Sequence, residues 1–251
     1  MATQTDLSGL TAIVTGASSG FGLHFAGILA AQGAHVVAIA RRADRLEALV
    51  EEIAASGGTA TALALDVSKH DDVARALGKL PQIDIVVNNA GFAGPSRAID
   101  CDEDEWRWTY DVNVNATWFV ARAAAAHMIA AKRGGSIVNI ASITGIRPGA
   151  AAAAYASSKA AVIQLTKALA MEWARHDIRV NALAPGYFET DLNRDLLLSD
   201  FGQSMMKRIP QRRFGQMSDL DGPLLLLASD ASRYMTGSVI EVDGGHLVSV
   251  L

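Results

Sequence analysis

The sequence predicts an α/β fold in which helices cover both faces of a parallel sheet. Strand-like and helix-like runs alternate along the chain, and the only biased segment is an alanine run at residues 150–154 that leads into a helix. The strand-like runs are apolar throughout, which is typical of strands buried on both faces. Hydrophobic residues make up 50% of the 251 residues and charged residues 19%, a globular composition. We therefore expect one domain over residues 1–251.

The expected strands are short runs rich in aliphatic and β-branched residues. The first, at residues 10–15, runs directly into a glycine-rich turn. The others follow at residues 34–40, 59–65, 83–88, 136–141, 178–184 and 238–242. Because helical patterns separate them, we expect the strands to lie parallel.

Helical patterns fill the segments between these strands. One starts at residue 23, after the glycine-rich turn. Those at residues 43–55 and 71–80 begin with the polar or acidic residues that helix starts prefer. Two longer patterns cover residues 103–131 and 152–175.

The segment from Gly186 to Arg213 is an exception to the alternation. It lacks strand character, and its aromatic residues Tyr187 and Phe188 stand beside the Pro185-Gly186 turn. A long excursion inside a compact domain is typical of a lid or a binding segment. A surface insertion without a role is the alternative. We expect a substrate lid over about residues 186–213.

Composition and charge exclude several classes of function. The net charge is −4 without a basic stripe, so nucleic acid is not an expected partner. No stretch approaches the roughly 20 apolar residues of a membrane span, and the N-terminus lacks the features of a signal peptide. The single cysteine, Cys101, forbids an intrachain disulfide, and the six histidines show no metal-site spacing. We expect a cytoplasmic protein without a metal.

The turn after the first strand has the composition of a phosphate-binding loop. Glycines let the backbone turn tightly and approach a pyrophosphate, and the following helix offers free N–H groups. An ordinary connection between strand and helix is the alternative. The expected cofactor residues here are Gly16, Ser18, Ser19, Gly20, Phe21 and Gly22.

Tyr155 and Lys159 suggest acid–base chemistry. Residues four apart on a helix share a face, so the phenol and the ammonium can point into one site. A nearby lysine charge favours the phenolate, and the Ser142 hydroxyl can hydrogen-bond the same substrate oxygen. Ser142, Tyr155 and Lys159 could together donate a proton to a ketone oxygen and accept one from the corresponding alcohol. The alternative is a partly exposed tyrosine beside a surface lysine.

The end of the second strand indicates which nucleotide is bound. Proteins of this α/β fold that prefer NAD place an acidic side chain at this strand end, where it holds the ribose hydroxyls. Here Ala40 stands at the strand end and Arg41-Arg42 follow. No acidic side chain is therefore present to repel a phosphate on the nucleotide, and the planar guanidinium of Arg41 is suited to bind one. We expect NADP(H) to be favoured over NAD(H) by about tenfold. The alternative is that the two arginines merely begin a solvated helix.

Taken together, these motifs resemble those of the short-chain dehydrogenase/reductase family over nearly the whole chain. All stand in the family's order and at its usual spacings. They are Thr15-Gly-Ala-Ser-Ser-Gly-Phe-Gly22, Leu65-Asp-Val67, Asn88-Asn-Ala-Gly91, Asn113-Val-Asn-Ala-Thr117, Gly135-Ser-Ile-Val-Asn-Ile-Ala-Ser142, Tyr155 to Lys159, Pro185-Gly186 with Thr190, and Val242-Asp-Gly-Gly245. The resemblance implies a Rossmann-type doubly wound sheet of about seven strands, with the site at the carboxyl ends of the strands.

The resemblance also implies further cofactor contacts. They fall to residues that follow the third to sixth strands, together with the catalytic pair. These are Asp66, Val67, Asn89, Ala90, Gly91, Ile140, Tyr155, Lys159, Pro185, Gly186 and Thr190. As alternatives, Asp66 could be a helix cap and Asn89 a turn residue.

Four catalytic residues are implied by the same resemblance. Ser142 would hold the substrate oxygen and Tyr155 would exchange a proton with it. Lys159 would lower the tyrosine pKa and hold the nicotinamide ribose. Asn113 would order a helix backbone and a water, a role for which Asn115 is a rival.

The substrate is expected to be a neutral ketone, aldehyde or 3-oxoacyl compound. The residues beside the motifs are mostly small or apolar, and no arginine clamp for a carboxylate is evident. The expected substrate contacts are Ala93, Ser142, Ile143, Thr144, Ala150, Tyr155, Tyr187 and Phe188. An NAD(H)-dependent sugar or polyol dehydrogenase is the alternative, and a catalytically silent nucleotide-binding regulator is a more distant one.

Self-association is expected in addition to catalysis. The helical patterns at residues 118–130 and 160–173 carry apolar residues on more than one face, and the tail at residues 247–251 is apolar too. The resemblance implies a homotetramer built as a dimer of dimers.

Overall fold

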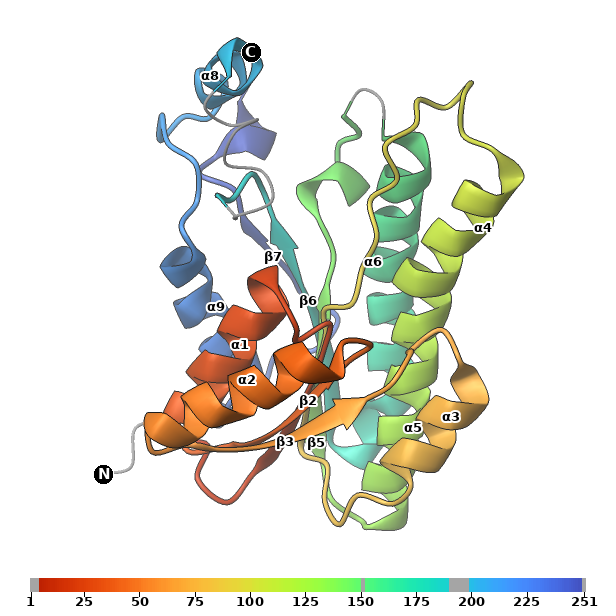
Figure 1. Cartoon of the computed structure of the whole chain (residues 1–251), viewed down its shortest axis with the longest axis vertical. Coiled ribbons are helices and arrows are strands. Elements are labelled where there is room, and N and C mark those ends of the chain that lie inside the picture. Colours follow the sequence, from red (N-terminus) through yellow and green to blue (C-terminus); the bar gives the residue numbers. More distant parts are fainter. Residues whose placement is uncertain (1–4, 150–151, 190–198, 250–251) are drawn as a thin grey trace.

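Seven parallel strands form one continuous sheet with helices on both faces. The computed structural model describes residues 5–149, 152–189 and 199–249. The strand order is β3-β2-β1-β4-β5-β6-β7, so the chain winds outward in one direction from β1 and in the other from β4 (Figure 1). This arrangement confirms the predicted doubly wound α/β fold.

The strands lie close to the predicted runs. Each pairs with its neighbours in parallel register, for example Val14 beside Ala38 on β2 and Val87 on β4. The bounds are β1 Thr11–Thr15, β2 His35–Ala40, β3 Thr59–Ala64, β4 Ile85–Asn88, β5 Gly135–Ile140, β6 Ile178–Pro185 and β7 Val239–Val242.

The helices follow the predicted patterns with some differences. The first begins at Gly20 rather than at residue 23, and the helices Asp200–Met206 and Asp221–Ala228 were not predicted. The segment expected as one helix over residues 103–131 is divided by a π-helical turn at Asp111–Asn115, and α3 ends three residues before the predicted end. No helix within the described residues is long and apolar enough to cross a membrane. The bounds are α1 Gly20–Ala31, α2 Ala43–Ala55, α3 His70–Leu77, α4 Glu103–Tyr110, α5 Ala116–Ala130, α6 Ala153–Trp173, α8 Asp200–Met206 and α9 Asp221–Ala228.

Alternating strand residues divide the core into two layers. Val14 points into the layer shared with α1, α2 and α9, whereas its neighbour Ile13 points into the layer shared with α3, α5 and α6. The first group of helices lies on one side of the sheet in Figure 1 and the second on the other. Because both faces are covered, the central strands β1, β2 and β4 are buried on both faces, whereas the edge strand β3 is partly exposed.

A buried carboxylate fastens the start of β4 to two other elements. Asp84 Oδ2 accepts a hydrogen bond of 2.8 Å from the Thr11 backbone N–H, at the start of β1. Asp84 Oδ1 accepts one of 3.0 Å from the Arg133 guanidinium, just after α5. The Asp84 side chain is 8% exposed, so both donors have a charged partner that water cannot easily replace.

Replacing Asp84 with alanine is expected to lower the free energy of unfolding by about 1–3 kcal/mol, because the partly buried Thr11 N–H loses its acceptor. Urea denaturation followed by circular dichroism measures the change. Glu52→Ala, at an exposed position of α2, is the matched control and should stay within about 0.5 kcal/mol of wild type. Equal stability of the two variants would show that the Asp84 contacts contribute nothing.

Candidate active site

The turn between β1 and α1 leaves backbone N–H groups open to an anion. Gly16 and Gly20 have φ angles of 68° and 56°, which residues with a Cβ atom rarely adopt. A Cβ atom on Gly22 would collide with the Gly16 carbonyl oxygen and the Asn89 side chain. Ser19 stands at the N-cap of α1 but makes no capping hydrogen bond through its side chain. The turn therefore fits the pyrophosphate of a dinucleotide.

A cavity of about 290 Å³ lies beside this turn, and we refer to it as the nucleotide cavity. The ends of β1, β2, β3 and β4 all contribute to its wall. The predicted cofactor residues that it brings together are Gly16, Ser18, Ser19, Arg41, Arg42, Asp66, Val67, Asn89, Ala90 and Gly91.

The two arginines after β2 have different surroundings. Arg42 Nη2 donates to the hydroxyls of Ser18 and Ser19 at 2.9 and 3.0 Å, so Arg42 holds the glycine-rich turn. The Arg41 guanidinium carbon lies 5.9 Å from the centroid of the Trp108 ring. Within the described part of the chain, Arg41 forms no hydrogen bond or ion pair. Arg41 thus offers the nucleotide cavity an uncompensated cation.

Hydrogen bonds shape the other walls of the nucleotide cavity. Asp66 Oδ1 accepts from the Ser68 backbone N–H at 3.0 Å and from its hydroxyl at 2.8 Å, which makes Asp66 a turn-capping residue as well as a lining residue. The Thr15 hydroxyl oxygen accepts from the backbone N–H groups of Asn89 and Ala90, both at 3.0 Å. These bonds fix the end of β4 against the end of β1.

A second cavity of about 230 Å³ adjoins the first, and we refer to it as the catalytic cavity. The two share lining residues from the loop after β4, namely Asn89, Gly91 and Phe92. The other predicted site residues that the catalytic cavity brings together are Phe21, Ala93, Ile140, Ser142, Tyr155, Lys159, Pro185 and Gly186.

Tyr155, Lys159 and Ser142 lie close together in the catalytic cavity. The Lys159 ammonium is buried, donates a hydrogen bond of 2.7 Å to the Ile140 carbonyl oxygen, and lies 5.6 Å from the centroid of the Tyr155 ring. Ser142 Oγ accepts from the backbone N–H of Thr144 at 3.2 Å and from its hydroxyl at 2.9 Å. The serine hydroxyl is thereby oriented.

Burial controls the protonation of the pair. Removal from water raises the pKa of the Tyr155 phenol, and a hydrogen bond with Ser142 acts in the opposite direction. Removal from water also lowers the pKa of Lys159 from 10.5 to about 8. Desolvation of the phenol is the larger effect, so the pKa of Tyr155 lies above its ordinary value, and the lowering expected from Lys159 stays a prediction.

The structure distinguishes the two asparagines that the sequence left open. Asn113 is fully buried within the π-helical turn, and its Nδ2 donates to the Phe92 carbonyl oxygen at 2.9 Å and to the Ser158 hydroxyl at 2.8 Å. Its Oδ1 accepts from the Phe92 N–H at 2.7 Å. Asn115 is exposed and donates to Asp111 instead. Asn113 is therefore the asparagine that reaches the site.

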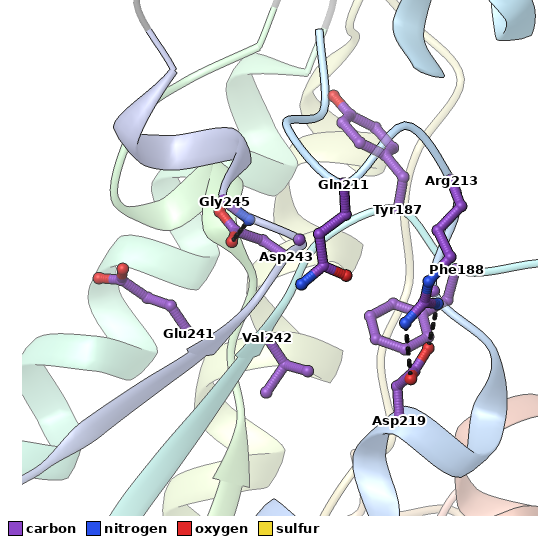
Figure 2. Close-up of a pocket in the computed structure, with 11 residues that line it drawn as sticks. Tyr187, Phe188, Gln211, Arg213, Asp219, Glu241, Val242, Asp243 and Gly245 are labelled. Atoms are coloured by element: carbon purple, nitrogen blue, oxygen red, sulfur yellow. Dashed lines mark hydrogen bonds and ion pairs between the residues drawn. The ribbon is translucent and has the colours of Figure 1, made fainter. Parts of the chain in front are cut away.

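Several expected substrate residues lie elsewhere. Phe188 is 4% exposed and packs edge-on against Phe21, and with Tyr187 it lines a separate cavity next to β7 (Figure 2). Phe188 does not line the catalytic cavity, because an apolar ring gains more from burial in the core. Ile143 is 3% exposed and does not line the catalytic cavity either. Ala150 and Thr190 lie outside the described residues.

Among the residues at the site that sequence reasoning did not assign, three bear on its shape. Trp108 and Val112, four apart on the α4 side, line the nucleotide cavity, and Thr15 joins β1 to the loop after β4. The spacing of Trp108 and Val112 on one helical face is a signal that the sequence carries. It cannot be assigned to the cofactor without knowing which way α4 packs.

Comparison with known proteins agrees with this geometry. A family model described as enoyl-(acyl carrier protein) reductase matches residues 16–246. The chain is 40% identical over 251 residues to gluconate 5-dehydrogenase from Gluconobacter oxydans (strain 621H), with 97% of each chain covered. It is 39% identical over 247 residues to 2-dehydro-3-deoxy-D-gluconate 5-dehydrogenase from Escherichia coli (strain K12), with 96% of each chain covered.

A solved structure gives the same result for the fold. The crystal structure of a gluconate 5-dehydrogenase from Burkholderia cenocepacia J2315 in complex with NADP and tartrate is 37% identical and superposes with a TM-score of 0.94, covering 98% of both chains. The chain therefore belongs to the short-chain dehydrogenase/reductase family and is an NAD(P)-dependent oxidoreductase that interconverts an alcohol and a carbonyl.

Proposed function

We propose that the protein is an NADP(H)-dependent enzyme that interconverts a carbonyl and a secondary alcohol, with Tyr155 as its general acid and base. The placement of Ser142, Tyr155 and Lys159 around one cavity that joins the nucleotide cavity carries this proposal. A proton donor, a hydroxyl and a buried cation next to a dinucleotide site are the parts that carbonyl reduction requires.

Tyr155 and Ser142 are placed to act on one substrate oxygen. Both line the same cavity, and the Ser142 hydroxyl lowers the pKa of the Tyr155 phenol against the effect of burial. Because Ser142 Oγ already accepts from two groups of Thr144, its own proton is left to donate. The raised pKa keeps the Tyr155 phenol protonated at neutral pH, so it can give its proton to the oxygen during reduction. In alcohol oxidation the phenolate takes that proton back.

Lys159 and Asn113 support this proton transfer. With a pKa of about 8, Lys159 is mostly protonated at neutral pH, and its charge favours the phenolate that Tyr155 becomes after giving up its proton. Asn113 holds the Phe92 backbone through two hydrogen bonds and thereby fixes the wall that the two cavities share. Bound NADP(H) would supply or accept the hydride.

The preference for NADP(H) over NAD(H) rests on the end of β2. Ala40 places no carboxylate there, and Arg41 lines the nucleotide cavity without a hydrogen-bond or ion-pair partner among the described residues. A guanidinium is suited to bind a 2′-phosphate through two N–H groups. The Burkholderia relative, whose structure contains NADP, supports the same choice.

For the substrate we infer a hydroxylated sugar acid of the gluconate type. The two relatives named above act, by their names, on gluconate and a dehydro-deoxygluconate. These names support a substrate that carries a carboxylate over the neutral carbonyl expected from the sequence.

Tyr155→Phe is expected to lower kcat by about 10²- to 10⁴-fold while NADPH binds as in wild type, because only the exchangeable proton is removed. NADP(H) absorbance reports turnover with gluconate-type acids, neutral sugars and polyols, simple ketones and 3-oxoacyl thioesters, and fluorescence titration reports binding. Tyr234→Phe, at a fully exposed tyrosine, is the matched control.

Substantial turnover by Tyr155→Phe would overturn the role of the phenol. Turnover by wild type of neutral compounds alone would reject the sugar-acid class. If nothing turned over while NADPH bound tightly, the chain would be a nucleotide-binding regulator instead.

Lys159→Met is expected to be inactive but more stable than the cofactor-free wild type by about 1–3 kcal/mol at pH 7. The folded pKa of about 8 lies below the ordinary 10.5, so the unfolded chain holds the proton more tightly and burial of the charge opposes folding. As the pH rises from about 8 towards 10.5, wild type loses this cost and the two proteins should approach equal stability. Denaturation at a series of pH values measures this, and a pH-independent difference would contradict it.

Arg41→Ala is expected to weaken NADPH binding by about tenfold or more and to leave NADH binding unchanged, because only NADPH carries the 2′-phosphate. Arg42→Ala, which loosens the glycine-rich turn, should weaken both nucleotides. Isothermal titration calorimetry with each nucleotide distinguishes the two effects. If Arg41→Ala affected NADPH and NADH alike, the assignment of the phosphate site would be rejected.

A further inference from the structure

One wall of the nucleotide cavity is built by α4 and the π-helical turn that follows it, and neither of the residues that line the cavity there was assigned to the cofactor from the sequence. Trp108 and Val112 line the cavity there, whereas Ser18, Arg41 and Asp66 come from the loops after β1, β2 and β3. Trp108 is half-buried, and its ring contacts Arg41. Among the described residues, no other aromatic ring makes such a contact with Arg41. The indole is thus brought to the phosphate-binding arginine from a part of the chain more than sixty residues away.

We propose that Trp108 is a specificity-determining residue that positions Arg41 for the 2′-phosphate of NADP(H). This inference rests on the proposed preference for NADP(H). The Arg41 guanidinium carbon lies 5.9 Å from the indole centroid, within the range of an attractive cation–π contact. Such a contact occupies the face of the ring, whereas hydrogen bonds to a phosphate use the N–H groups at the edge of the guanidinium. Both can therefore be made at once.

The different surroundings of Arg41 and Arg42 support this role for Trp108. Arg42 is held by Ser18 and Ser19, so its donors serve the glycine-rich turn. Arg41 has no acidic partner among the described residues, and without Trp108 its long side chain would sample many rotamers in water. The indole restricts the rotamers of Arg41 and leaves its charge in place. An aspartate at the same position would neutralise that charge. A preorganised cation binds the phosphate at a lower entropic cost.

Trp108→Leu tests the proposal, because leucine keeps an apolar contact and removes the aromatic face. Calorimetry should show weaker binding of NADPH and of 2′,5′-ADP by about two- to fivefold, with NADH and 5′-AMP unchanged. Trp108→Phe should restore most of the affinity for the phosphorylated ligands. Trp106→Leu is the matched control, because Trp106 is exposed and stacks on Tyr110 instead.

Indole fluorescence provides a second readout that does not depend on activity. Binding of 2′,5′-ADP should change the tryptophan emission of wild type and of Trp106→Leu, and this change should be lost in Trp108→Leu. In addition, Trp108→Leu combined with Arg41→Ala should bind 2′,5′-ADP no more weakly than Arg41→Ala alone, since the indole acts through the arginine.

The outcomes separate this inference from the proposed function. If Arg41→Ala does not discriminate NADPH from NADH, the NADP(H) preference fails and Trp108 has no phosphate site to serve. If Arg41→Ala discriminates but Trp108→Leu leaves 2′,5′-ADP binding unchanged, only the role of Trp108 fails. Equal weakening of phosphorylated and unphosphorylated ligands by Trp108→Leu would make the indole a general wall of the cavity, which also overturns the inference.

Discussion

The change of winding direction between β1 and β4 is the constraint on which the site depends. The chain leaves β1 toward the helices of one face and leaves β4 toward the helices of the other, so the two loops separate above adjacent strands. The space between them cannot be filled by either loop. It is kept narrow by Gly16 and Gly22, where any side chain would collide with neighbouring atoms, and by the bonds of Thr15 to the loop after β4. The nucleotide cavity follows from the topology.

Polar groups beneath this crevice are buried at a cost that hydrogen bonds offset. Asn88 donates to Asn139 Oδ1 at 2.9 Å, and Asn139 donates to the Thr166 hydroxyl at 2.9 Å, which links β4, β5 and α6 below the catalytic cavity. Two groups are exceptions. Asn88 Oδ1 is buried without a hydrogen-bond partner among the described residues, and one carbonyl oxygen is a small compensation for burying the Lys159 ammonium. The lowered pKa of Lys159 reflects this cost of burial. The cofactor-free protein gives up stability there in exchange for a cation beside the phenol.

Those parts of the fold and the site that depend on local patterns were predictable from the sequence. Apolar β-branched runs gave the strands, and Tyr155 and Lys159 came together because four residues make about one helical turn. The burial of Phe188 was not predictable, because its position beside Gly186 says nothing about which layer the ring enters. The π-helical turn around Asn113 was missed for a similar reason. It depends on tertiary hydrogen bonds that a helical pattern does not contain.

The helical stretch from α4 through the π-helical turn to α5 connects parts of the site that the motifs treat separately. Glu105 accepts a hydrogen bond of 2.6 Å from the Ser96 hydroxyl and so holds the loop that carries Ala93 to the catalytic cavity. One turn later Trp108 reaches Arg41 in the nucleotide cavity, and Asn113 then fixes the wall between the cavities. The walls of the catalytic cavity and of the nucleotide cavity are therefore held by one continuous helical stretch, through Glu105, Trp108 and Asn113.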